Sequence, residues 1–183
     1  MNISRDILPE CFVDTNIVNT FLKMEGIYTG ANHCHGCNKV GNMMQQNLKD
    51  EFALGIIIDN DKKQHSYNAA FYLIGKTEHL ELLKHRSNRH FLIRVSPAMD
   101  EFILKVAERN HIKMSDYDLP DNLKDFTVIT KDAKAKDSVN LKKLFRNMVD
   151  DEEMMLLKNV LGYICKNKYG CDAKILSSFF KIV

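Results

Sequence analysis

The sequence predicts an α/β protein, in which a mainly parallel central sheet is flanked by helices and followed by a helical C-terminal extension. Residues 52–58 form an apolar run without polar alternation, which is typical of a strand buried on both faces. Strand-like and helix-like segments then alternate, as crossovers between parallel strands require. From Ser138 onward the apolar spacing is helical. We therefore predict an α/β unit at residues 1–137 and a helical extension at 138–183, packed on the same domain.

The elements of the first half follow from apolar spacing and from Gly and Asn residues, which interrupt regular structure. Helically spaced apolar residues precede Gly26, a residue type common at helix ends. The predicted elements are, in order, a strand at 11–13, a helix up to Gly26, a strand at 27–29, a loop at 30–38, a helix at 39–48 and the strand at 52–58.

The second half is predicted to contain two strands and then mainly helices. Ser96 and Pro97 suit the cap and the first position of a helix that runs to Asn110. The predicted elements are, in order, a helix at 67–75, strands at 79–83 and 90–95 joined by a basic turn, the helix opened by Ser96, an irregular segment at 115–126, a brief strand at 128–129, and helices covering 141–149, 154–164 and 173–180.

The composition excludes some classes of function. The net charge is +2 with 27% charged residues of both signs, so nucleic-acid contacts would have to rest on a local patch. No apolar segment approaches the roughly 20 residues that span a bilayer, and residues 1–6 lack the apolar core of a signal peptide. Five cysteines, an odd number, fit a reducing compartment. We therefore expect a cytoplasmic protein without a membrane partner.

Two carboxylates, Asp59 and Asp61, directly follow the apolar run. Ligands of parallel sheets bind beyond the carboxyl ends of the strands, so Asp14, after the strand expected at 11–13, would lie at the same edge. Carboxylate oxygens are the ligands that Mg²⁺ and Mn²⁺ prefer. The pattern indicates a Mg²⁺ (or Mn²⁺) site made by Asp14, Asp59 and Asp61. The alternative is a plain turn after the strand, because Asp and Asn favour turns.

The order of strand, acid, helix, glycine-containing loop, helix, strand and Asp-x-Asp resembles the Toprim domain over residues 10–110. The resemblance implies a Toprim- or Rossmann-like sheet, with Asp14 as the first acid and Asp59 and Asp61 as the metal-binding pair. It implies a nuclease that acts on nucleic-acid phosphodiesters in a mobile-element or defence context. The family's first acid is nearly always Glu, and the shorter Asp14 shifts the carboxylate, which affects catalysis more than the fold. A non-catalytic binding module with the same fold is therefore the main alternative.

The segment Phe12-Val13-Asp14-Thr15-Asn16 also resembles the opening strand of PIN-type ribonucleases, which hold divalent metal with clustered acids. Residues 128–132 would then supply the distal acid. That family has no characteristic Asp-x-Asp after the third strand, and Glu51 is a poor candidate for its mid-chain acid. The Toprim resemblance is therefore preferred.

The loop at residues 33–37 has the sequence His-Cys-His-Gly-Cys. Cys34 and Cys37 are spaced as zinc ligands, but one C-x-x-C pair without a clear second half is a weak signal, and a polar loop is the simpler interpretation. Zn²⁺ is therefore not the expected metal. Because the Toprim family has a glycine-containing loop near its acids, the resemblance implies that His33, His35 and Lys39 face a phosphate. Asp14 and Lys39 are then the candidate catalytic residues.

Two basic clusters are candidates for phosphate contacts, which supply most non-specific affinity for nucleic acid. Lys84 and Arg86 lie in the turn before the strand at 90–95, and Lys131 and Lys134 begin a longer cluster that continues to Arg146. The alternative for both clusters is a solvated surface. The helical extension is a candidate surface for a protein partner.

Overall fold

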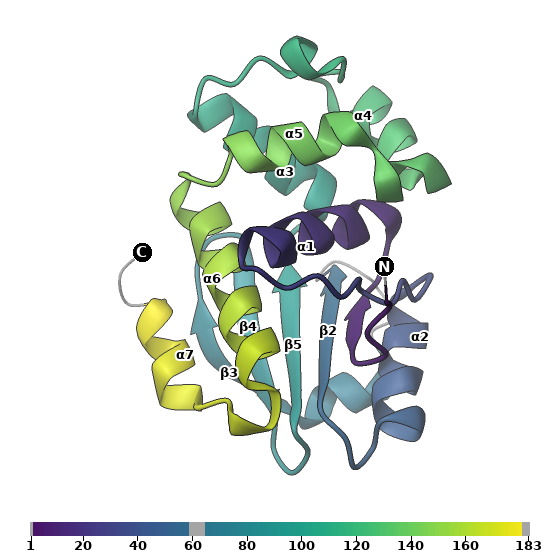
Figure 1. Ribbon diagram of the computed structural model, residues 1–183, viewed down its shortest axis with the longest axis vertical. Helices are drawn as coiled ribbons and strands as arrows, with labels where there is room; N and C mark the ends of the chain where they lie inside the picture. Colours follow the sequence, from purple (N-terminus) through teal and green to yellow (C-terminus); the bar gives the residue numbers. More distant parts are fainter. Residues whose placement is uncertain (1, 59–64, 181–183) are drawn as a thin grey trace.

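The computed structural model describes residues 2–58 and 65–180, which fold into a five-stranded mixed sheet with helices on both faces (Figure 1). The strands are β1 (Ile7–Pro9), β2 (Ala53–Ile58), β3 (Phe71–Lys76), β4 (Leu80–His85) and β5 (His90–Val95). In the sheet they follow the order β1-β2-β5-β4-β3. β1, β2 and β5 are parallel, whereas β4 and β3 run antiparallel to their neighbours. The predicted α/β class with a mainly parallel central part is confirmed.

The helices of the described residues are α1 (Phe12–Met24), α2 (Cys37–Asn42), α3 (Met99–Arg109), α4 (Leu123–Lys131), α5 (Val139–Asn147), α6 (Glu152–Asn167) and α7 (Ala173–Phe179). A π-helical segment, Met43–Asn47, continues α2, and short 3-10 segments include Ser66–Ala70 and Ala133–Asp137. Within the described part of the chain, no helix is long and apolar enough to cross a membrane.

β2 is buried on both faces, as its unbroken apolar run predicts. Leu54 and Ile56 belong to the larger core, in which α1, α3, α5 and α6 pack. In Figure 1, α1 crosses in front of the sheet near the carboxyl ends of β2 and β5, and α6 also lies on this face. Leu144 and Leu161 belong to the same core as Leu54, so the C-terminal helices share one core with the sheet.

The opposite face of the sheet is covered by α2 and its π-helical continuation, where Ile57 packs in one cluster with Val40 and Met44. The two layers approach closely at Gly55. A Cβ atom there would lie 2.8 Å from Leu92 Cδ1, 2.9 Å from Val40 Cγ1 and 3.0 Å from Met44 Sδ. Glycine is therefore required at this position by the packing of α2 on β2.

Two elements of the first half differ from the sequence prediction. The strand expected at 11–13 lies earlier, at β1, and Phe12 already belongs to α1, because Cys11 is the extended residue that precedes the helix. Residues 27–29 form no strand and precede an isolated bridge between Ile3 and Gly30.

Two elements of the second half also differ. The helix predicted at 67–75 is a 3-10 turn followed by β3, because these residues pair with β4 across a short turn. The brief strand predicted at 128–129 lies inside α4, whose start is capped by Asn122 through the N–H of Asp125 (3.0 Å).

One edge of the sheet collects the carboxyl ends of β1, β2 and β5 together with the start of β4 and the end of β3. α1 follows β1 and α3 follows β5, so both helices begin at this edge. Because β2 lies between β1 and β5, its carboxyl end is flanked by the starts of both helices. Sheets of this kind bind ligands at this edge.

The opposite edge holds a buried imidazole, His90, at the start of β5. Its Nε2 lies 2.9 Å from the Leu48 carbonyl, and its Nδ1 lies 2.7 Å from the Tyr67 hydroxyl. A carbonyl only accepts, so Nε2 carries a hydrogen, while the hydroxyl can donate to Nδ1 of a neutral ring. Burial is the largest cause that lowers the pKa of His90 below its ordinary value of 6.5.

We predict that Gly55→Ala lowers the free energy of unfolding by about 1–3 kcal/mol, because the added methyl group overpacks the interface between β2 and α2. Gly170→Ala is the control, since no atom lies within 4 Å of the Cβ that it would add. Urea unfolding monitored by circular dichroism measures both variants. Equal stability of the two would contradict the close packing at Gly55.

We also predict that the contribution of His90 to the free energy of unfolding decreases as the pH falls below 6.5. At pH values between 6.5 and the lower pKa of folded His90, the imidazole is protonated in the unfolded chain but neutral in the folded protein. Lowering the pH in this range therefore favours unfolding. NMR titration of the His90 ring gives its folded pKa directly. A titration midpoint at or above 6.5 would show that the ring is not held neutral by burial.

Candidate functional site

A buried carboxylate, Asp14, lies in the first turn of α1, beyond the carboxyl end of β1. Its side chain is 1% exposed, and Oδ2 accepts the backbone N–H of Cys11 (3.1 Å). Oδ1 is also buried and accepts no hydrogen bond from the described residues. An unpaired buried oxygen costs free energy, which a proton or a cation bound there would offset. The sequence analysis placed Asp14 directly after a strand, but the structure places it on a helix at the same edge.

The pKa of Asp14 is raised from 3.8 to about 7. Burial is the largest cause; hydrogen bonding with Cys11 opposes it, and the charges of Glu10 and Asp100 add to the rise. Asp100 stands in the first turn of α3, where its Oδ2 accepts the Thr127 hydroxyl (2.9 Å). Two interacting carboxylates therefore come from the two helix starts that flank the end of β2.

Two imidazoles from the loop before α2 lie against the start of α1. His33 Nδ1 is 3.0 Å from the Thr15 hydroxyl, and His33 Nε2 is 3.0 Å from His35 Nδ1. The Phe12 ring stacks on His33 with ring centroids 4.3 Å apart. Burial, followed by the neighbouring His35, lowers the pKa of His33, which favours its neutral form.

An open hollow of about 300 Å³ adjoins this loop. Its lining includes His33, His35 and Lys39, and its other polar side chains are the amides Asn32, Asn42 and Asn47. The charges of Lys136 and Lys39 add to the lowering of the His33 pKa, so both cations lie near the imidazole. The hollow thus offers one exposed ammonium group and several hydrogen-bonding groups to an anionic ligand.

The structure brings together three of the residues predicted to face a phosphate. His33, His35 and Lys39 line one hollow, and His33 contacts Thr15, the neighbour of Asp14. Asp59 and Asp61 lie outside the described residues and directly follow β2 in the chain. Within residues 2–58 and 65–180, no three His, Cys, Asp or Glu side chains are grouped so that they could hold a metal ion. A metal ion held by three such side chains would therefore need at least one ligand from outside these residues.

Cys34 and Cys37, the pair spaced as zinc ligands, are buried and belong to the core beneath α2 together with Val40. The Cys34 thiol donates to the Asn32 carbonyl (3.4 Å). Burial raises the pKa of Cys34 to about 11, which disfavours the thiolate that a metal requires.

The predicted nucleic-acid contacts lie in different places. Lys84 and Arg86 are at the opposite edge of the sheet from Asp14, where the Lys84 ammonium lies 5.5 Å from the centre of the Phe91 ring. Lys131 ends α4, and Lys134 follows in the next 3-10 segment; both side chains are exposed. Neither pair lines the hollow beside His33.

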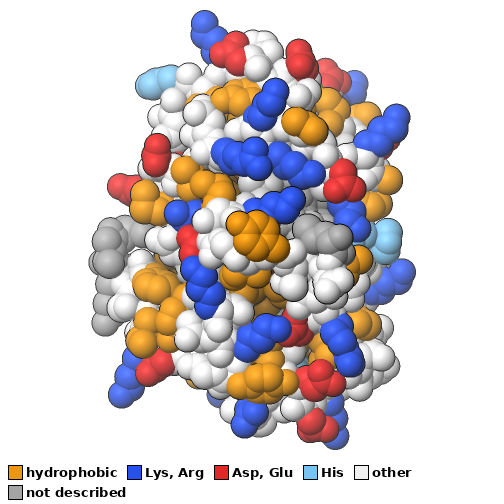
Figure 2. Space-filling view, in the orientation of Figure 1, with side chains coloured by type: hydrophobic (Ala, Val, Ile, Leu, Met, Phe, Trp, Pro, Cys, Tyr) orange, Lys and Arg blue, Asp and Glu red, His pale blue; other side chains and the backbone are white. Residues whose placement is uncertain are grey.

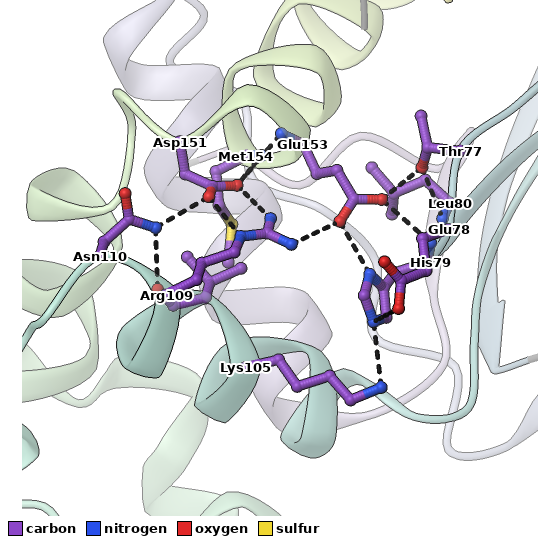
Figure 3. A network of polar contacts seen from close by, with 11 residues as sticks. Thr77, Glu78, His79, Leu80, Lys105, Arg109, Asn110, Asp151, Glu153 and Met154 are labelled. Atoms are coloured by element: carbon purple, nitrogen blue, oxygen red, sulfur yellow. Dashed lines mark hydrogen bonds and ion pairs between the residues drawn. The ribbon is translucent and has the colours of Figure 1, made fainter.

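A second polar group at this edge, which the sequence analysis did not identify, joins α3, α6 and the turn between β3 and β4 (Figure 3). Arg109 donates through Nε to Asp151 Oδ2 (2.6 Å) and through Nη1 to Glu153 Oε2 (3.0 Å). Glu153 Oε2 also lies 2.8 Å from His79 Nδ1, and Glu153 Oε1 accepts the His79 N–H (2.9 Å). Figure 3 shows these side chains converging from the three elements, and a hollow of about 450 Å³ adjoins them.

This ionic network is a structural cross-link. Burial alone would raise the pKa of both carboxylates. Hydrogen bonds from Arg109 nevertheless hold the pKa of Asp151 below its usual value, and those from Thr77 and His79 do the same for Glu153. Asp151 also caps the first turn of α6. Because protein groups already satisfy these carboxylates, the network differs from Asp14, which keeps one oxygen without a donor among the described residues.

Comparison with known proteins identifies no relative. No family model matches the chain, and no curated protein or solved structure matches it significantly. The functional argument therefore rests on the residues and their geometry.

We predict that Glu153→Ala lowers the free energy of unfolding by about 1–3 kcal/mol, because it leaves the buried His79 N–H without its acceptor and removes one of the two carboxylates that bind Arg109. Glu152→Ala, in the same helical turn but exposed, should change stability by at most about 0.5 kcal/mol. Thermal and urea unfolding measure both variants. A mild effect of Glu153→Ala would mean that the network does not cross-link the fold.

Proposed function

We propose that this chain is a divalent-metal-dependent protein that acts on nucleic-acid phosphodiesters at the sheet edge beside Asp14. The observation that carries the proposal is the buried Asp14 carboxylate, whose Oδ1 has no donor among the described residues. Asp100 interacts with it electrostatically, and Asp59 and Asp61 follow β2, the strand between the two helix starts. The order of these acids along the chain also resembles the Toprim domain. Mg²⁺ or Mn²⁺ would neutralise such a concentration of carboxylates.

In this proposal Asp14, Asp59 and Asp61 hold the cation. A bound divalent ion supplies Lewis acidity at a phosphoryl oxygen. Lys39, which lines the hollow beside His33, provides positive charge for a phosphate. His33, favoured in its neutral form, contacts Thr15 and His35 through its two ring nitrogens and so orients the His35 ring in the hollow.

Asp14→Asn should lower the affinity for Mn²⁺ at least about tenfold, because it removes an anionic ligand but keeps the side-chain shape and an acceptor for the Cys11 N–H. Calorimetric titration with Mn²⁺ measures the affinity, and Asp59→Asn and Asp61→Asn should behave alike. Asp121→Asn, at an exposed acid, is the control. Unchanged affinity in all three site variants would rule out this metal site.

The affinity for Mn²⁺ should also decrease as the pH falls below about 7, because a proton and the cation compete for the Asp14 carboxylate. If each bound ion displaces about one proton, the affinity for Mn²⁺ should fall at most about tenfold for each pH unit. The same titrations, repeated between about pH 6 and pH 8, measure it. A flat profile for the unmodified protein would contradict the assignment of Asp14 as a ligand.

A second candidate function is nucleic-acid binding without catalysis. It is favoured by the structural role of Asp14 Oδ2, which accepts the Cys11 N–H at the start of α1. A carboxyl group with a pKa of about 7 is partly neutral at physiological pH, and its neutral form is a poor metal ligand. Incubation of labelled DNA and RNA with Mn²⁺ or with EDTA separates the two functions. Mn²⁺-dependent cleavage that Asp14→Asn abolishes supports the enzyme, whereas binding without cleavage supports the second candidate.

A further inference from the structure

We infer that a basic hollow between α1 and α5 binds single-stranded nucleic acid, an inference that rests on the proposed function and names its class of substrate. The hollow has a volume of about 220 Å³. Four cations line it, from α1, the 3-10 segment at 133–137 and α5: Lys23, Lys136, Lys142 and Arg146. Figure 2 shows Lys and Arg side chains gathered on this part of the surface, where α5 lies above α1.

The positive charge of the hollow is compensated only weakly. Asp137 is the single acid in its lining. The Lys142 ammonium donates to the Asp137 carbonyl (3.0 Å) and lies 3.7 Å from its carboxylate, whose side chain is 84% exposed. Solvent around the exposed Asp137 carboxylate weakens this ion pair, so a phosphate can compete for the Lys142 ammonium. Phosphate groups are the ligands that such a cluster attracts most generally.

A buried amide fixes the segment that carries these cations. Asn16 is fully buried on α1, and its Nδ2 donates to the carbonyls of Ala135 (2.6 Å) and Ser138 (3.1 Å). The Thr20 hydroxyl donates to Asn16 Oδ1 (3.2 Å) and so sets the orientation of the amide. Lys136 lies between the two bonded carbonyls, and α5 begins directly after Ser138. The backbone under the cations is therefore ordered before a ligand binds, which lowers the entropic cost of binding.

The hollow and the candidate site share the helix α1. α1 carries Asp14 in its first turn and Lys23 in its last, while Asn19 and Thr20 line the hollow between them. Lys136 is near enough to His33 to affect its ionisation. A phosphate backbone that follows α1 would therefore reach the sheet edge at which Asp14 lies.

An exposed aromatic ring favours a single strand over a duplex. Tyr28 is 73% exposed. It lies two residues before Gly30, which lines the hollow and pairs with Ile3. Ile3 is also exposed and lines the same hollow. Basic grooves with exposed aromatic rings hold unpaired bases by stacking. The bases of a duplex are stacked on one another and offer a protein mainly their edges.

The test measures the fluorescence anisotropy of a labelled single-stranded oligonucleotide of mixed sequence and of the matching duplex. EDTA is present, so that metal binding does not contribute. The single strand should bind more tightly to the full chain. The double variant Lys142→Glu/Arg146→Glu should lower this affinity at least about tenfold. It should also reduce the slope of log affinity against log salt concentration by about 1.4, because each of the two lost phosphate contacts removes about 0.7.

Two further variants complete the test. Lys49→Glu/Lys174→Glu makes the same change in net charge at two exposed cations that do not line the hollow and should retain most of the affinity. Tyr28→Ala should lower the affinity about tenfold without changing the salt slope, because stacking releases no counterions, and Tyr28→Phe should retain it. Circular dichroism verifies the fold of each variant.

Equal affinity for the duplex, or equal losses in the two charge-reversal variants, would overturn the inference. The proposed function fails by a different observation. Absence of Mn²⁺ binding would overturn the metal site, whereas absence of single-strand preference in EDTA would overturn only the role of the hollow.

Discussion

The rest of the structure depends on the fact that β2 has no polar face. Residues 53–57 are all buried, so both sides of the sheet must be covered. Each Å² of apolar surface removed from water contributes about 25 cal/mol, which favours helices on both faces. The connection from β1 to β2 supplies one helix to each face, because α1 packs in the larger core on one side and α2 packs on the other.

The position of α1 brings polar side chains into the interior near the edge of the sheet. Thr15 donates to the Cys11 carbonyl (2.8 Å), and Asn16 is bonded to the segment before α5. Asp14 differs, because only one of its oxygens has a partner among the described residues. The ionic network around Arg109 shows that this fold can satisfy buried carboxylates at the same edge. A buried oxygen that has no donor among the described residues therefore distinguishes Asp14 from the carboxylates of that network.

The sequence predicts those elements whose apolar spacing is strong and local, such as β2, β5 and the helices α3, α5 and α6. It fails for β3, since the residues that follow Tyr67 suit a helix or a strand, and pairing with β4 decides between them. Within the site, His33 and Lys39 line one hollow because the loop that carries His33 leads directly into α2. The interaction of Asp14 with Asp100 and the contact of Arg109 with Asp151 join distant parts of the chain. Tertiary packing alone creates these pairs, and no local pattern encodes them.

The Asn16 amide also determines when the basic hollow can exist during synthesis. Its two acceptors lie 119 and 122 positions downstream, so α1 is made long before the segment that it holds. Ribosomes add about 5–20 residues per second, which leaves the amide unpaired for several seconds. Until α5 has emerged and docked, one wall of the hollow is missing. A nascent chain therefore cannot yet present the complete set of cations, which come together only when the helical layer closes.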